Sequence, residues 1–170
     1  MTTDAAPIVT TAAEAESLSV GPQQVRVLAS AETGSPVGII DYTVAPGFSP
    51  PPYMQRHTHE DAGWVVLEGT VEFHVEDGSV ITAEAGSSFV HPRGCWFRWR
   101  NPDPDRPARA ICWFSPAGFE QFFVDLAATA GDHFGKGGSI EDFAVHLVAL
   151  RHRYGMEPHP SAGVPAPETP

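Results

Sequence analysis

The chain has 170 residues, of which 42% are hydrophobic, and it carries a formal net charge of -11 at pH 7. This length predicts one domain with a substantial core, because a chain of this size buries about 70% of its unfolded surface. The acidic charge argues against nucleic acid or an anionic membrane as a partner, since both select a concentrated basic patch.

The two ends of the chain differ in composition from its middle. Residues 1–22 are rich in Ala, Thr and Glu, and residues 157–170 form a Pro-rich tail. Neither can bury much apolar surface, so we expect both to be flexible or draped over a neighbour. The start has no basic, apolar signal sequence, and no run approaches the roughly 18 apolar residues of a membrane helix, so we expect a cytoplasmic protein. We interpret Cys95 and Cys112 as reduced core thiols.

Short β segments separated by turn residues fill residues 23–116, a pattern typical of a sandwich or barrel. Asp77 and Gly78 predict a tight hairpin turn. Alternation along 70–76 places Phe73 inward and His74 outward. We expect strands at 24–30, 37–45, 62–68, 70–76, 79–83, 87–91, 95–100 and 108–114.

Two helices are predicted within residues 117–156, where they would pack on the barrel. The first carries an apolar stripe at i, i+3, i+4 and i+7, which we interpret mainly as core: Phe119, Phe122, Phe123 and Leu126. The second begins at Ser139, with Asp142 completing a variant of the capping box, and ends at Gly155. Its expected inward residues are Ile140, Phe143, Ala144, Leu147 and Val148.

The stretch GFSPPPYMQRHTHEDAGWVVLEG, residues 47–69, concentrates ionisable side chains between a Pro-rich loop and an apolar strand. His57 and His59 are two positions apart, which on an extended strand places both imidazoles on one face. There they could meet one metal ion or one substrate. On a coil they need not converge.

This stretch resembles the first motif of the cupin superfamily, in which a glycine precedes His-x-His, a glutamate and a closing glycine. The second cupin motif is matched by Gly86, Pro92, Gly94 and Asn101, with Phe97 standing at its histidine position. Over residues 24–155 the chain is similar to small single-domain, quercetin 2,3-dioxygenase-like cupins, in which VLEG, PRG and SPAGFE segments recur. The resemblance implies an all-β jelly-roll barrel, at residues 23–116, followed by C-terminal helices.

The resemblance also implies four metal-ligand positions, which two alignments place differently. Counting back from Gly69, they fall on Gln55, His57, Ala62 and Phe97. Counting forward from the literal His-x-His, they fall on His57, His59, Gly63 or Trp64, and again Phe97. We prefer the first alignment, and in both the acid and the last histidine are missing. A catalytic ion needs about three protein ligands, so no metal is favoured. A single Fe, Mn, Ni or Zn ion would have to use His57, His59 and Glu60.

Alternation also predicts which residues face the barrel interior. Phe97 and Trp99 share an inward face, where they would form an aromatic wall suited to apolar or aromatic substrates. The alternative is that these rings simply fill the barrel. The expected substrate-binding residues are Phe97, Trp99, Trp64, Tyr53 and Phe89.

Three classes of function remain. The first is a metal-independent cyclase, isomerase or dehydratase acting on a hydrophobic small molecule, with His57 as base or acid and Gln55 as a hydrogen-bond donor. His59 and His91 are further acid or base candidates. The second, implied by the resemblance, is a quercetinase-like dioxygenase, and the third is a non-catalytic binding module. The missing ligands favour the first. A homodimer is also expected, since similar cupins commonly pair and aromatic residues such as Trp96 and Phe89 exceed what one barrel would bury.

Overall fold

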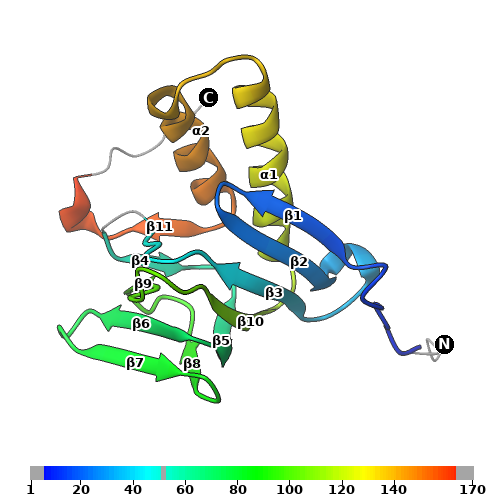
Figure 1. Cartoon of the computed structure of the whole chain (residues 1–170), viewed down its shortest axis with the longest axis horizontal. Coiled ribbons are helices and arrows are strands. Elements are labelled where there is room, and N and C mark those ends of the chain that lie inside the picture. Colours follow the sequence, from blue (N-terminus) through cyan, green and yellow to red (C-terminus); the bar gives the residue numbers. More distant parts are fainter. Residues whose placement is uncertain (1–5, 51–52, 164–170) are drawn as a thin grey trace.

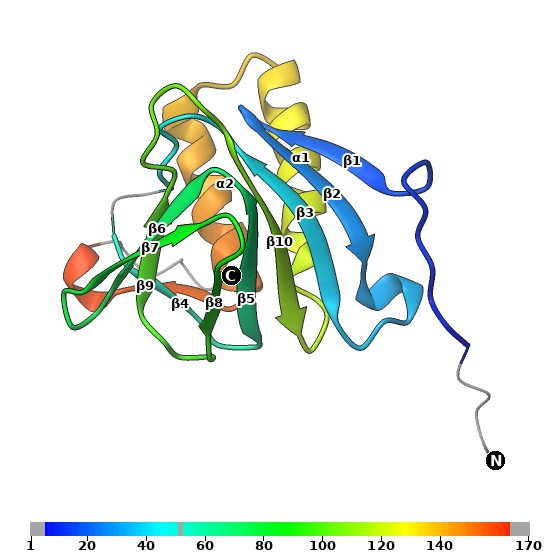
Figure 2. The same ribbon diagram turned by 60° about the horizontal axis from the view of Figure 1, so that its bottom comes forward.

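Two antiparallel sheets form a barrel in the computed structural model, which describes residues 6–50 and 53–163. Figure 1 shows two helices lying together on one side of the sheets, and Figure 2 looks at the barrel with these helices behind it. The six-stranded sheet has the order β1-β2-β3-β10-β5-β8, and the five-stranded sheet has the order β11-β4-β9-β6-β7. The predicted jelly-roll barrel with C-terminal helices is confirmed.

The strands are β1 (Glu16–Val20), β2 (Gln23–Ala29), β3 (Gly38–Val44), β4 (Gln55–His57), β5 (Asp61–Glu68), β6 (Thr70–Val75), β7 (Val80–Glu84), β8 (Ser88–His91), β9 (Phe97–Arg100), β10 (Ala108–Ser115) and β11 (Met156–Pro158). All eight predicted strands are present, and their ends differ from the prediction by at most two residues. The predicted hairpin at Asp77 and Gly78 joins β6 to β7, with Gly78 at φ 87°.

Strand β10 shows how alternation builds the core. Ala108, Ala110, Cys112 and Phe114 are buried, whereas the residues between them are half-buried on the outer face. Because β10 lies between β3 and β5, its inward side chains pack at the centre of the larger sheet. Cys112 is a free thiol there, as predicted.

Three strands, β1, β4 and β11, were not predicted from the sequence. β1 and β11 lie at the edges of their sheets, and β4 has only three residues. β1 lies within residues 1–22, predicted to be flexible, but it pairs with β2 from Glu16 opposite Val27 to Val20 opposite Gln23. β11 occupies the start of the predicted tail and pairs with β4, placing Met156 opposite His57. A proline such as Pro158 normally disfavours a strand assignment, because it lacks a backbone N–H group. β11 is an edge strand, however, where proline is tolerated. Residues 1–5 and 164–170 of these two segments lie outside the described residues.

The two predicted helices are α1 (Glu120–Gly135) and α2 (Ile140–Arg153). The Ser139 hydroxyl accepts a hydrogen bond from the Asp142 amide, as the capping pattern predicts. Ala144, however, is exposed and does not line the cavity, whereas Ile140 lines the cavity together with Phe143, Leu147 and Arg151 but remains 80% exposed at the start of α2. Within 6–50 and 53–163, neither helix combines the length and hydropathy needed to cross a membrane.

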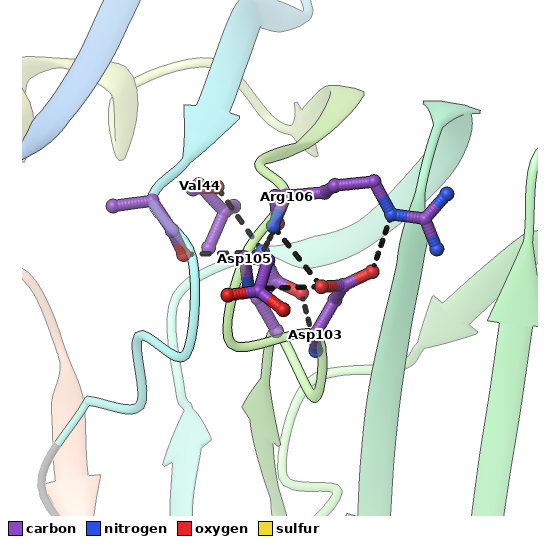
Figure 3. Close-up of polar contacts among 6 residues, drawn as sticks. Val44, Asp103, Asp105 and Arg106 are labelled. Atoms are coloured by element: carbon purple, nitrogen blue, oxygen red, sulfur yellow. Dashed lines mark hydrogen bonds and ion pairs between the residues drawn. The ribbon is translucent and has the colours of Figure 1, made fainter.

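Asn101 closes the loop between β9 and β10. Its side chain is 1% exposed, and Nδ2 donates to the carbonyls of Val44, Ala45 and Arg106, while Oδ1 accepts from the Asp103 amide. Figure 3 shows the loop folded back toward the end of β3, with Asp103 also paired to the Arg106 side chain. This asparagine of the second motif therefore fixes the end of the barrel.

Phe89 and Trp96 are covered within one chain. Phe89 stacks on Phe73 with ring centroids 4.0 Å apart, and Trp96 packs against the Arg56 guanidinium and the His159 ring. These contacts account for both rings without a second chain, so they lend the homodimer no support, and it stays a prediction.

Candidate functional site

A cavity of about 460 Å³ runs from the barrel interior to the space between α1 and α2. This volume lies in the range of small-molecule binding sites. Aromatic and aliphatic side chains make up most of its wall, including Tyr42, Trp64, Phe97, Trp99, Phe119, Phe122, Phe123, Leu126, Phe143 and Leu147. The polar residues in the wall are Gln23, Gln55, His57, His91 and Arg151. The barrel is therefore hollow rather than filled by its own aromatic residues.

Phe97 takes the inward position that the motif spacing predicts. It lies opposite Gln55 in the pairing of β9 with β4, and it is 1% exposed. Its ring lies 4.1 Å from the His91 ring and 5.8 Å from the His57 ring, between centroids. Phe97 thus places an apolar face against both imidazoles.

His57 and Glu60 form a buried pair, 4% and 3% exposed. β4 ends at His57, and the chain then turns so that Glu60 Oε1 contacts His57 Nδ1. Burial, together with the charge of Arg151, lowers the pKa of His57 to about 3. Burial raises the pKa of Glu60 to about 7, although His59 and Arg93 oppose this shift. His57 is therefore neutral, and Glu60 changes protonation near neutral pH.

His91 lies beside this pair. It is 2% exposed on β8, opposite Ala62 of β5, and its ring centroid is 5.2 Å from that of His57. Its side chain makes no hydrogen bond to any described residue, and its Nδ1 is fully buried. Burial, with a smaller effect of His57, lowers the pKa of His91 to about 3. The cavity therefore presents two neutral imidazoles.

Arg151 joins the site from α2, and the sequence did not indicate it. It is 7% exposed and donates from Nη2 to Gln55 Oε1, from Nη1 to the Tyr53 hydroxyl at 2.7 Å, and from Nε to Met156 Sδ at 2.9 Å. The signal was its place on the inward stripe of the helix, eight positions after Phe143 and four after Leu147.

Three predicted site residues do not line the cavity. His59 is exposed, because β4 ends at His57 and the two imidazoles do not share a strand face. Tyr53 is half-buried and reaches the site through Arg151, which donates a hydrogen bond to its hydroxyl and lies over its ring. Phe89 lies behind the wall, between Phe73 and His91. Gln55, His57, His91, Trp64, Phe97 and Trp99 do come together around the cavity.

The residues present do not fit a catalytic metal centre. Of the four ligand positions Gln55, His57, Ala62 and Phe97, only His57 is a good ligand, and its Nδ1 is engaged by Glu60. In the part of the chain that the structure describes, no group of three or more His, Cys, Asp or Glu side chains could hold a metal ion. Since a catalytic ion needs about three protein ligands, no step of the chemistry is assigned to one.

Comparisons with known proteins agree with this architecture. Residues 40–114 match the family model described as a cupin domain. A search of curated proteins finds no match. Similar solved structures include KdgF from Halomonas sp., with 20% identity and a TM-score of 0.57 over 68% of this chain and 99% of that one. An RmlC-like cupin from Shewanella frigidimarina has 20% identity and a TM-score of 0.56, covering 68% and 96%.

A third neighbour is Pac13 from Streptomyces with uridine, at 14% identity and a TM-score of 0.52, covering 69% of this chain and 88% of that one. Pac13 is described as a nucleoside dehydratase. At these identities the similarity shows the fold alone.

Proposed function

We propose that this chain, which has the cupin fold, is a metal-independent enzyme that isomerises, cyclises or dehydrates a hydrophobic small molecule by acid and base chemistry. The observation that carries this proposal is the buried contact between His57 Nδ1 and Glu60 Oε1 at the wall of an apolar cavity. A second neutral imidazole, that of His91, lies beside it.

The protonation of Glu60 decides what His57 can do. When Glu60 is ionised, it accepts the Nδ1 hydrogen of His57, which leaves the Nε2 lone pair available as a base. When Glu60 is protonated, it donates to Nδ1, and Nε2 then carries the hydrogen and acts as an acid. The pKa of Glu60, about 7, places this exchange in the working range of most enzymes.

The reaction moves protons and keeps the electrons within the substrate. His57 removes a proton from one substrate atom and returns the same proton to another atom in an isomerisation or a cyclisation. In a dehydration the returned proton goes to a hydroxyl group, which leaves as water. Because Arg151 holds Gln55 Oε1, the amide nitrogen of Gln55 remains available to donate to a substrate carbonyl. No external oxidant or reductant is required.

The comparison with Pac13 supports the reaction class alone. Its description as a nucleoside dehydratase indicates that a barrel of this fold can host the loss of water. The aromatic wall of this chain favours a more apolar substrate.

Two other functions give different results in one experiment. A quercetinase-like dioxygenase would need His57, His59 and Glu60 to meet at one ion, although His59 is exposed. A binding module would hold its ligand without turnover. The purified protein, treated with a chelator, is incubated in D2O with a panel of hydrophobic carbonyl and hydroxy compounds, and products are identified by mass spectrometry.

We expect turnover or deuterium incorporation that survives chelation and is lost in His57→Asn and Glu60→Gln. His146→Asn is the matched control, because this exposed histidine of α2 lies outside the cavity and should leave turnover unchanged. Activity that disappears on chelation and returns with iron, manganese or nickel would support the dioxygenase. Binding without turnover or exchange would support the binding module.

We also propose that the chain forms a homodimer. Val65, Leu67 and Val90 are exposed together on the outer face of β5 and β8, where a second copy would cover them. Light scattering should give twice the 18.2 kDa of the chain, and Val90→Lys should return the mass to that of a monomer. A monomer at high concentration would refute this assembly.

A further inference from the structure

Arg151 is a buried cation, which is unusual for an arginine. It is 7% exposed, and Leu150 is the only other buried residue of α2. Arginine side chains are almost never buried unless they are paired, because an unpaired charge loses its hydration. The hydrogen-bond partners of Arg151 therefore need explanation.

All of those partners are neutral. They are the Gln55 amide oxygen, the Tyr53 hydroxyl and the Met156 thioether, and a thioether is a weak acceptor. Among residues 6–50 and 53–163, no carboxylate lies within ion-pair distance of Arg151. Four other arginines of the fold differ, because they have a carboxylate partner at 3.2 Å or less: Arg56 with Glu157, Arg93 with Asp61, Arg100 with Glu72 and Arg109 with Asp41.

The guanidinium also has unused hydrogen-bonding capacity. Each terminal nitrogen carries two hydrogens, and Nη1 and Nη2 each make one hydrogen bond, so one N–H group of each remains. Arg151 lines the same cavity as His57 and His91. Burial keeps the pKa of both imidazoles at about 3, so they add no competing positive charge. An anion entering this space would meet one cation, Arg151.

The remainder of the cavity is apolar. Phe122, Phe123 and Leu126 of α1 face Phe143 and Leu147 of α2 across it. These side chains offer no hydrogen bonds, so the part of a ligand that lies between the helices must be a hydrocarbon or aromatic group. The cavity thus joins one cationic point to an apolar space.

We propose that the substrate is a hydrophobic carboxylic acid whose carboxylate pairs with Arg151 while its apolar body lies between α1 and α2. The planar guanidinium suits a carboxylate, which can accept from both terminal nitrogens. This inference rests on the proposed function, since it names the class of molecule that His57 and Glu60 would act on. Arg151 also holds Gln55, so one residue would position both the substrate and the proposed donor to its carbonyl.

The test compares a probe acid with its neutral amide. Isothermal titration calorimetry measures binding of 1-naphthylacetate and of 1-naphthylacetamide, which differ little in shape. We expect the acid to bind roughly 10- to 100-fold more tightly than the amide, the range for a hydrogen bond to a charged group. Arg151→Met should remove this preference, and Arg151→Lys should keep part of it. Equal affinities in the natural chain, or a preference that survives Arg151→Met, would overturn the proposal.

A second variant separates ligand binding from a structural role. Gln55→Glu places a carboxylate of similar shape against Arg151, so it should raise Tm and abolish the preference for the acid. Arg151→Met should leave the Tm of the ligand-free protein unchanged or raise it, because it removes an unpaired buried charge. A large drop in Tm for Arg151→Met, with no gain for Gln55→Glu, would mean that Arg151 is structural.

The outcome does not depend on turnover. His57→Asn should bind 1-naphthylacetate normally even though it loses activity, so a failed activity screen leaves the carboxylate assignment testable. Conversely, turnover of neutral compounds combined with equal binding of acid and amide would refute the carboxylate assignment and retain the acid and base chemistry.

Discussion

His91 should control how the stability of this protein depends on pH. Folding removes its imidazole from water without giving Nδ1 a hydrogen-bond partner among the described residues. The perturbation is His91→Leu, which removes the ionisable group and places an apolar side chain against Phe97 and Phe89 in its stead. The unfolded chain can protonate His91 readily, whereas the folded chain cannot.

The magnitude follows from the pKa of His91, which is 6.5 as the ordinary value and about 3 in the fold. Because the folded pKa is the lower one, protonation of His91 favours the unfolded chain. The free energy of unfolding is therefore unaffected by His91 above pH 6.5 and decreases as pH falls from 6.5 toward 3. Each pH unit below the ordinary value costs about 1.36 kcal/mol, so at about pH 5.0 the loss is about 2 kcal/mol.

Urea unfolding at about pH 7.5 and at about pH 5.0 measures this loss for both proteins. Between the two conditions, the unfolding free energy of the natural chain should fall by about 2 kcal/mol more than that of His91→Leu. The dependence of the unfolding free energy on urea should be the same in the two proteins, which shows that they expose similar surface. If both proteins lose equal stability, His91 is not held neutral inside the barrel and the site is misassigned.

Further predictions concern the scaffold, and thermal or urea unfolding checks each. Gly63→Ala would place a Cβ 2.6 Å from Trp113 Nε1, so we expect it to cost about 1–3 kcal/mol. Its control is Gly131→Ala at an exposed position of α1, where the new Cβ meets nothing within 4 Å. This variant should gain about 0.5–1 kcal/mol of stability. A Gly63→Ala variant more stable than Gly131→Ala would contradict the packing described. Asn101→Ala strands the backbone groups of Val44, Arg106 and Asp103, so it should cost about 2 kcal/mol or more; a neutral result would show that water replaces the amide.

The sequence predicted the barrel wall better than the chemistry at its centre. Phe97 and Trp99 were placed correctly because strand alternation and motif spacing are local properties, and both hold within β9. His59 was named as an acid or base candidate, but the two-residue spacing brings both imidazoles to one face only on a strand, and β4 ends at His57, so the alternative of a coil applies. Glu60 was considered only as a metal ligand, whereas the turn after β4 brings it to His57 Nδ1.

The contacts of Arg151 could not be predicted from a local pattern. It contacts Gln55 across 96 positions of the chain, and this contact depends on how α2 and β11 return to β4. The edge pairing of β11 with β4 positions the end of α2 near the barrel, yet β11 has three residues and includes a proline. Arg151 was not among the residues predicted to point inward, although its spacing of four positions from Leu147 was a signal, and only the tertiary structure shows that its partners are neutral.

The most direct test of the His57 and Glu60 pair is nuclear magnetic resonance of ¹⁵N-histidine-labelled protein, which reports the protonation of each imidazole nitrogen. As pH rises through about 7, His57 should stay neutral and change from the Nε2–H form to the Nδ1–H form as Glu60 ionises. In Glu60→Gln this exchange should disappear. A His57 that becomes doubly protonated near its ordinary pKa of 6.5, or that keeps one tautomer throughout in the natural chain, would contradict the proposed acid and base site.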